Sequence, residues 1–192
     1  MIRQVAIAAS TALLSLTLAS NAQAQAQTMP HFGISAGASI PQSSFGDGVN
    51  TGYNVNALVN VGIPLSPLGF RAEAGWNHFD LSGSNASGSV RMVNGALNVV
   101  LVPSSVMTAK PYLIAGVGMY NVKTSVDNSG GLLTGPFTTQ SSDTRLGFNG
   151  GLGFAFGLGP VGTFVEGRYV SVNGKNGSSS LSFVPVSFGI TF

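Results

Sequence analysis

Phe183-Val-Pro-Val-Ser-Phe-Gly-Ile-Thr-Phe192 is the stretch that ends the sequence, and in it apolar side chains alternate with smaller or more polar ones. This period-2 alternation predicts a β-strand that continues to the final residue. The terminal residues of soluble domains usually fray, whereas the last strand of a closed barrel must pair with the first. The stretch therefore predicts a β-barrel that is closed by its last strand.

The first residues have the pattern of an export signal. Arg3 supplies a short basic region, residues 5–19 form an apolar core, and residues 21–27 offer small-x-small cleavage sites. The apolar core is shorter than the roughly 20 residues that a membrane-spanning helix needs. We therefore expect residues 1–26 to be a cleaved secretory signal peptide and residues 27–192 to form one exported domain.

The composition is unusual for a soluble protein. Only 7% of the residues are charged, and the chain contains 27 Gly and no Cys. Low charge suits a surface that faces lipid, and the absence of Cys excludes disulfides, thiol nucleophiles and zinc–thiolate sites. Removal of Arg3 with the leader would leave seven basic and six acidic residues, a net charge of +1. This balance argues against a nucleic-acid binder, which would carry a basic patch.

Period-2 patterns in the rest of the chain predict eight strands, each long enough to cross a membrane at a tilt. The connections alternate between short ones that contain Pro and longer ones that are rich in Ser, Asn, Gly and Asp. This arrangement is typical of an up-and-down bacterial barrel, whose short turns face the periplasm. The sequence thus predicts an all-β, eight-stranded antiparallel transmembrane barrel. Its strands are expected at residues 31–40, 52–63, 68–79, 89–101, 110–122, 144–158, 161–172 and 181–192.

Four charged residues indicate which face of the wall points into the barrel. Arg71 and Glu73 fall in the third predicted strand, and Glu166 and Arg168 fall in the seventh. Each pair is two residues apart and so shares one face, which is opposite to the apolar face. A charge at the lipid midplane costs roughly 2 to 4 kcal/mol, so we expect the four side chains to form a network in a filled polar interior. The further polar residues expected in this network are Asn56, Asn98, Arg145 and Asn149.

This network has two interpretations. It is either a gate for a narrow ion path or a closed plug of paired charges that fixes packing and register, because loss of one partner of a buried pair costs roughly 3 to 5 kcal/mol. The two Glu side chains also have the chemistry of an acid/base pair. However, each lies beside an Arg that would hold it ionised, so we expect no catalytic residue here.

Trp76 and His78 fall on the lipid-facing side of the third strand, close to its end, where an interfacial aromatic girdle is expected. The other histidine, His31, starts the first strand and is too far from His78 to share a metal ion. The four Asp residues lie in or beside the longer connections, without the ligand spacing of a calcium loop. We therefore expect neither a metal nor a cofactor.

The strand Pro111-Tyr-Leu-Ile-Ala-Gly-Val-Gly118, the two Arg/Glu pairs and the terminal Ser187-Phe-Gly-Ile-Thr-Phe192 resemble the small bacterial outer-membrane β-barrels of the OmpA transmembrane-domain and OmpX type. The resemblance implies a place in the outer membrane of a Gram-negative-type bacterium, in contact with outer-membrane lipid. In that family the barrel-assembly machinery reads a terminal signal of alternating apolar residues, which would correspond here to Phe188, Ile190 and Phe192.

The resemblance leaves several functions open, because fold does not imply function. The first hypothesis is a monomeric, non-enzymatic outer-membrane protein with a structural or adhesion-like role, which presents four extracellular loops. The longest loop, at residues 123–143, carries apolar residues among polar ones and is a candidate contact with another surface. One alternative is a narrow pore for ions or small solutes. Another is an enzyme that acts on lipid A, with His78 and a neighbouring Ser of the protein as its catalytic residues. The third is a soluble exported barrel.

Overall fold

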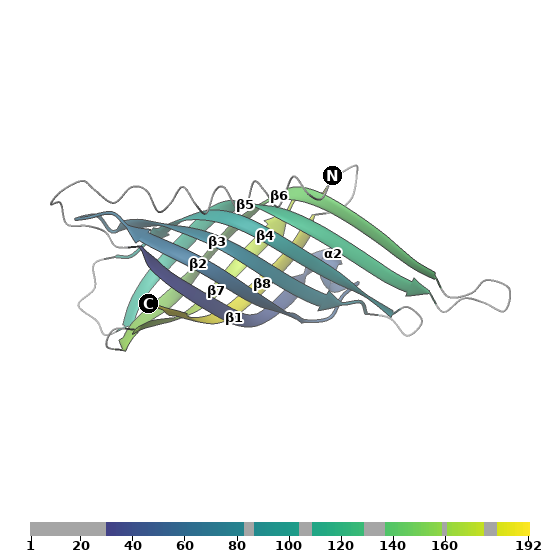
Figure 1. Cartoon of the computed structure of the whole chain (residues 1–192), viewed down its shortest axis with the longest axis horizontal. Coiled ribbons are helices and arrows are strands. Elements are labelled where there is room, and N and C mark those ends of the chain that lie inside the picture. The colour runs from purple at the N-terminus through teal and green to yellow at the C-terminus, as the bar shows by residue number, and fades with distance from the viewer. Residues whose placement is uncertain (1–29, 83–86, 104–108, 129–136, 159–160, 175–179) are drawn as a thin grey trace.

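Eight antiparallel strands form a closed barrel in which each strand pairs with its neighbours in sequence (Figure 1). The computed structural model describes residues 30–82, 87–103, 109–128, 137–158, 161–174 and 180–192. The strands are β1 (His31–Gln42), β2 (Gly52–Gly62), β3 (Leu68–Asp80), β4 (Ser87–Leu101), β5 (Ala109–Asn128), β6 (Phe137–Leu158), β7 (Val161–Val172) and β8 (Leu181–Thr191). This confirms the predicted eight-stranded barrel.

A short helix, α2 (Ser43–Gly46), follows β1 and was not predicted from the sequence. Within the described ranges, no helix is both long enough and apolar enough to cross a membrane. The expected signal peptide, residues 1–26, lies outside the described residues.

The barrel closes between its first and last strands, as the terminal alternation predicts. β1 and β8 are antiparallel, with Ala36 opposite Phe188. Phe32 and Phe192 exchange two backbone hydrogen bonds of 3.1 and 2.9 Å. The final residue of the sequence is therefore part of the closure, and the sheet has no free edge at this seam.

The two ends of the barrel differ in their connections. We call the end that carries His31, Phe192 and the tight turn at residues 63–67 the turn end, and we call the opposite end, which carries α2, the loop end. β5 and β6 extend beyond the other strands at the loop end, where they form a long hairpin (Figure 1). This β5–β6 hairpin is the part of the described chain that projects farthest from the barrel.

The β5–β6 hairpin corrects the prediction of a long loop at residues 123–143. Lys123 pairs with Ser142, and the ladder continues to Asn128 opposite Phe137. Beyond the apolar part of the wall a hairpin needs no apolar face, so its polar strands lack the alternation that identifies the other strands. Of the apolar residues expected to make contact from this segment, Leu132, Leu133 and Pro136 lie outside the described residues, and Phe137 is the first residue of β6.

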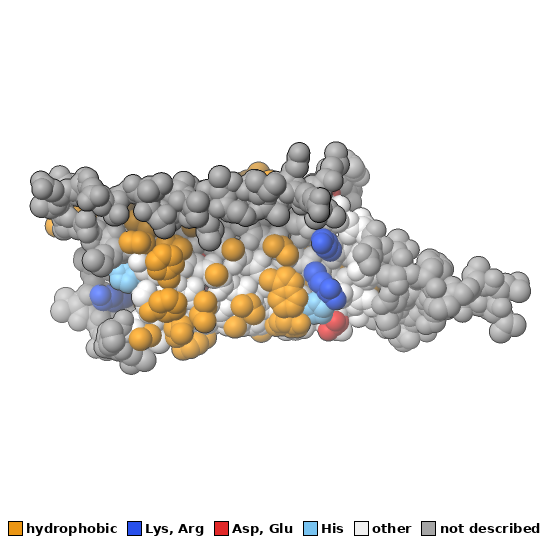
Figure 2. Space-filling model, viewed as in Figure 1, with side chains coloured by type: hydrophobic (Ala, Val, Ile, Leu, Met, Phe, Trp, Pro, Cys, Tyr) orange, Lys and Arg blue, Asp and Glu red, His pale blue; other side chains and the backbone are white. Residues whose placement is uncertain are grey.

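The outer wall of the barrel is apolar and exposed. Leu97 of β4 is 68% exposed and Met119 of β5 is 63% exposed, and both alternate with buried neighbours. Figure 2 shows hydrophobic side chains over the middle of one face, with Lys, Arg, His and acidic side chains towards its ends. An apolar surface of this extent is typical of a barrel that faces lipid, because a soluble barrel turns its apolar face inwards.

The inner wall contains three layers. Near the turn end, a small apolar cluster includes Leu58, Tyr112 and Phe164. The middle layer is polar and holds the four predicted charges. At the loop end a larger apolar cluster fills the barrel, and we call it the loop-end cluster. Its buried members are Phe45, Val49, Phe79, Val90, Met92, Tyr120, Val122, Val170, Val172 and Phe183.

Candidate functional site

The structure brings Arg71, Glu73, Glu166 and Arg168 together at the centre of the barrel. Arg71 Nη1 lies 2.7 Å from Glu166 Oε2. Arg168 holds both carboxylates: its Nη1 and Nη2 donate to Glu73 at 2.6 and 3.0 Å, and its Nε lies 2.7 Å from Glu166 Oε1. β3 and β7 each contribute one cation and one anion two residues apart, and the pairs Arg71–Glu166 and Arg168–Glu73 cross the lumen. We call these four residues the charge network.

Other polar groups complete the charge network. Tyr112 donates its hydroxyl hydrogen to Glu166 Oε2 at 2.7 Å, and Asn98 Nδ2 donates to Glu73 Oε2 at 3.0 Å. Arg71 Nε donates to Asn60 Oδ1 at 2.7 Å. Asn149 Nδ2 reaches the network indirectly, by donating to Asn98 Oδ1 at 2.9 Å. Each carboxylate thus accepts bonds from arginine and from a neutral donor, which is what a buried charge requires.

Tyr112 and Asn60 were not predicted as members of the site. Both alternate with outward apolar residues, so their parity places them on the inner wall. Parity does not give their height in the barrel, which depends on strand tilt and register. The Arg71 guanidinium carbon also lies 5.5 Å from the Tyr112 ring and 5.1 Å from the Phe164 ring. Aromatic faces therefore support this cation from the turn-end side.

Two of the expected partners lie elsewhere. Asn56 Nδ2 donates to Ser35 Oγ at 3.2 Å and to Asn54 Oδ1 at 3.1 Å, in an amide and hydroxyl cluster beside the charge network. Arg145 lies near the loop end, where its Nε is 3.3 Å from Asp143 Oδ2. The prediction that Arg145 belongs to the charge network is therefore wrong. Its side chain faces inwards as expected, but it lies nearer the loop end than the network does.

Glycines on the inner wall make room for the long side chains of the centre. A Cβ at Gly153 would collide with the ring and hydroxyl of Tyr112, and a Cβ at Gly116 would collide with Asn98. Both partners bond the carboxylates of the charge network. The bare backbone at these positions therefore determines where the network can form.

The loop-end cluster closes the barrel above the charge network. Phe79 of β3 packs edge-on against Phe45 of α2 and Phe183 of β8, with ring centroids 5.2 and 5.4 Å apart. α2 is held near the barrel by backbone bonds between its following residues and the end of β3: Asn50 N to Asp80 O at 2.8 Å is one. The helix therefore contributes a side chain that covers the opening of the barrel.

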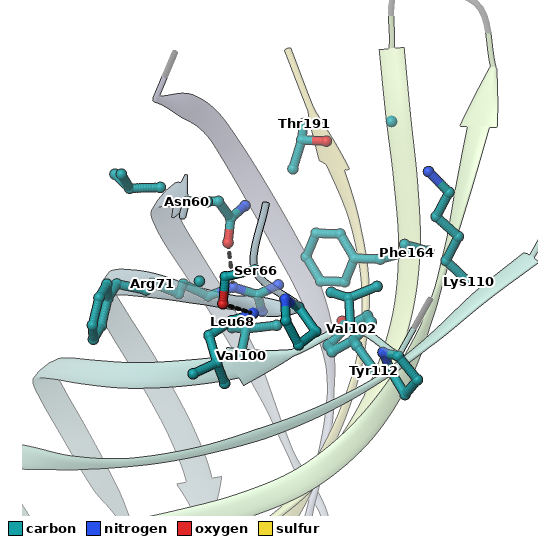
Figure 3. Close-up of a pocket in the computed structure, with 18 of the residues that line it drawn as sticks. Asn60, Ser66, Leu68, Arg71, Val100, Val102, Lys110, Tyr112, Phe164 and Thr191 are labelled. Carbon is teal, nitrogen blue, oxygen red and sulfur yellow. Dashed lines mark hydrogen bonds between the residues drawn. The ribbon is translucent and has the colours of Figure 1, made fainter. Parts of the chain in front are cut away.

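Cavities are large at the two ends of the lumen and small between them. The turn-end cavity is about 880 Å³, and Figure 3 shows Arg71, Val100, Tyr112 and Phe164 around it. The loop-end cavity is about 410 Å³. Between them, beside Arg168, the remaining space is about 20 Å³, which is room for about one water molecule. The charge network and the loop-end cluster thus fill the space between the end cavities.

The predicted aromatic residues lie on the outer wall. Tyr53, Trp76 and His78 form a group with ring centroids 5.2 to 5.8 Å apart. His78 Nε2 lies 3.1 Å from Asp80 Oδ1, and its Nδ1 has no hydrogen-bond partner. In the described chain, His78 therefore has a carboxylate partner and no Ser hydroxyl partner of the kind that the lipid A enzyme hypothesis requires.

The remaining predicted residues are on the surface. His31 is the exposed first residue of β1. Phe188 and Phe192 are exposed on the outer wall, and Ile190 between them is partly exposed. Among the described residues, no group of three or more His, Cys, Asp or Glu side chains could hold a metal ion.

Comparison with known proteins matches this architecture. The profile described as outer membrane protein beta-barrel domain matches residues 10–192. A search of curated protein sequences found no significant match.

Several solved structures share the fold. Neisserial surface protein A superposes with a TM-score of 0.62 and 18% identity, over 84% of this chain and 95% of that one. A major outer membrane protein from Thermus thermophilus superposes with a TM-score of 0.56 and 17% identity, over 85% of this chain and 99% of that one. Ail, the attachment invasion locus protein of Yersinia pestis, superposes with a TM-score of 0.53 and 15% identity, over 85% of this chain and 97% of that one. At these identities the likeness shows a common fold.

Proposed function

The chain belongs to the outer membrane protein β-barrel domain family, and from this premise we propose that it is a non-conducting, non-enzymatic membrane scaffold that presents its loop end to other surfaces. The family places the chain in the outer membrane. In the proposed orientation the turn end faces the periplasm and the loop end faces outwards, as short turns and longer connections do in bacterial barrels.

The observation that carries the proposal is the filled lumen. Solute passage would require a continuous path, and the space beside Arg168 is about 20 Å³. Opening this layer would separate buried ion pairs, which costs roughly 3 to 5 kcal/mol when one partner is lost. The loop-end cluster would have to open as well. This supports a plug over a gate as the role of the charge network.

The shape of the loop end supports a role in contact. The β5–β6 hairpin projects beyond the other strands, and its ladder is continuous from Ala109 to Asn128. α2 and the residues after it are tied to the barrel, for example by Ser82 N donating to Gly48 O at 3.0 Å. A projecting hairpin on a fixed platform can reach another surface with little loss of conformational entropy. The name of Ail, an attachment protein with the same fold, agrees with such a role.

Export and assembly complete the proposal. Residues 1–26 would be removed as a signal peptide, and Phe188, Ile190 and Phe192 would be read by the barrel-assembly machinery. The placement of these three side chains on the outer wall, in β8 and the residue that follows it, beside the closing strand β1, supports this role.

Shortening the hairpin tests the surface role. Replacing residues 127–138 with Asn-Gly would leave Val126 and Thr139, which pair in the ladder, on either side of a two-residue turn. Bacteria that produce the protein should adhere to immobilised heparin or to epithelial monolayers several-fold better than bacteria without it. The shortened variant should lose this gain while it still shows a heat-modifiable band on a denaturing gel.

A matched control changes the opposite end of the barrel. Leu65 is fully exposed in the tight turn and has a φ of 58°, which Gly adopts easily. Leu65→Gly should therefore leave both folding and adhesion unchanged. Adhesion that survives the shortened hairpin, or that never exceeds the level of bacteria without the protein, would refute the surface role.

A further inference from the structure

Two cations on the outer wall face each other across neighbouring strands. Among the described residues, Arg91 of β4 and Lys123 of β5 are the only Lys or Arg side chains with outward parity, and they are direct cross-strand partners. Both are exposed, and neither forms an ion pair or side-chain hydrogen bond with another described residue. Like charges directly opposite one another destabilise a sheet. The pair therefore lacks a counter-ion within the described protein.

This cation pair lies where the apolar wall ends. His78 of β3 is opposite Arg91, so the row runs across three strands. Two residues nearer the turn end on β4 is Val93, which is 54% exposed and apolar. Figure 2 shows Lys and Arg side chains gathered at one edge of the hydrophobic band, beside a His and an acidic side chain. In a membrane this edge coincides with the level of the lipid headgroups.

Neutral hydrogen-bonding groups continue the row on β6. Ser142 is opposite Lys123, and its Oγ lies 3.4 Å from Asn121 Oδ1. The nearest acidic side chain on β3 is Asp80, whose Oδ1 lies 3.1 Å from His78 Nε2. Asp80 adds one negative charge near the two positive charges of Arg91 and Lys123, so the row keeps a net positive charge.

We propose that Arg91 and Lys123 bind the phosphate of a lipid headgroup, while the acyl chains of that lipid lie on the apolar wall below. A phosphate between the two cations accepts hydrogen bonds from both and removes their mutual repulsion. The apolar wall directly beneath the pair favours a phosphate carried by a lipid over free phosphate. The site requires membrane insertion and does not depend on adhesion at the loop end, so the two proposals can fail separately.

The only Trp in the sequence is a reporter for this site. Trp76 lies on the outer wall, opposite Val93 and two residues from His78. Lipids with brominated acyl chains quench a Trp with which they are in contact. The protein is folded in dodecyl maltoside, an uncharged detergent, and titrated with dibrominated phosphatidic acid or with diacylglycerol that carries the same chains. Phosphatidic acid should quench Trp76 at a concentration at least tenfold lower than diacylglycerol does. Each cation is expected to raise the affinity for the charged lipid about fivefold.

Two variants assign the preference to the cation pair. The double substitution Arg91→Gln with Lys123→Gln should bring the two lipids to equal quenching. Lys110→Gln removes the same kind of charge at the turn-end cavity, far from Trp76 in the barrel, and should keep the wild-type preference. Heat-modifiable mobility shows that each variant is folded.

Three results would overturn the proposal. These are equal quenching by the two lipids in the wild type, a preference that survives the double substitution, and loss of phosphatidic acid quenching when millimolar inorganic phosphate is added. The last result would show that the cations bind free anions as well as they bind a lipid headgroup. Persistent quenching in phosphate, with loss in the double variant alone, supports the lipid site.

Discussion

The charge network and the loop-end cluster fill the same lumen by different physical means. In the network, three nitrogens of Arg168 lie 2.6 to 3.0 Å from two carboxylates. In the cluster, Phe79 packs against two rings with centroids 5.2 and 5.4 Å away. Ion pairs depend on particular atoms, whereas apolar packing depends mainly on volume. The comparison implies that the centre should be intolerant of conservative change and the loop end tolerant.

Removal of one cation from the network should have the largest effect. Arg168→Ala leaves Glu73 and Glu166 with less compensation in a buried site, and we expect a loss of about 3 to 5 kcal/mol in the free energy of unfolding. Denaturant unfolding in lipid vesicles, followed by Trp76 fluorescence, measures this loss. Lys110→Ala, an exposed position, should change stability by less than about 0.5 kcal/mol. Equal effects of the two substitutions would show that the network is not a stabilising plug.

Truncation in the loop-end cluster should have the next largest effect. Phe79→Ala removes a fully buried ring, and we expect a loss of about 3 kcal/mol, the lower end of the range for such changes. We expect a loss at the lower end of the range because α2 is a single helical turn within a connection and can move into the space that the ring leaves. The same unfolding assay applies. A loss below about 1 kcal/mol would mean that the cluster is loosely packed.

Conservative substitutions test the comparison itself. Arg168→Lys keeps the charge but replaces a three-nitrogen contact with a single ammonium, whereas Phe79→Leu keeps a smaller apolar side chain in the same layer. We expect Phe79→Leu to cost less than the roughly 3 kcal/mol of Phe79→Ala and Arg168→Lys to cost more than Phe79→Leu. The difference between the two variants in the unfolding assay is the result of interest. The reverse order would contradict the distinction between the two layers.

A pair of glycine substitutions should differ in sign, and its outer-wall member should change stability least. Gly153→Ala places a methyl group against Tyr112, which donates to Glu166, and we expect a loss of about 1 to 3 kcal/mol from overpacking. At Gly95, on the outer wall, a Cβ would meet nothing within 4 Å. Gly95→Ala should be neutral or stabilise by up to about 1 kcal/mol. Two equal losses would show that strand conformation, and not space for Tyr112, is what Gly153 provides.

The sequence predicts the barrel and its sidedness because strong physical constraints act on single residues. Apolar residues must alternate strictly with other residues where one face of a strand meets lipid, so the eight strands can be recognised in the sequence. Charges are costly on the lipid face, so the pairs Arg71/Glu73 and Glu166/Arg168 identify the inner wall. The β1–β8 closure follows from the alternation that ends at Phe192.

Other features could not be predicted because no local pattern determines them. Height in the lumen depends on register, so Arg145 has the right parity but lies with Asp143 at the loop end. The β5–β6 hairpin extends past the lipid, where polar residues on both faces remove the alternation. α2 is a single turn, and its place depends on the packing of Phe45 in a cluster drawn from most of the barrel.

Single-channel recording across a planar lipid bilayer tests the central claim most directly. The heat-modifiable, folded protein is inserted and the current is recorded at a series of voltages. Because the charge network and the loop-end cluster fill the space between the end cavities, we predict no discrete conductance steps. Reproducible steps from the folded wild-type protein, absent after boiling, would show that the lumen opens and would contradict the account of a filled, non-conducting barrel.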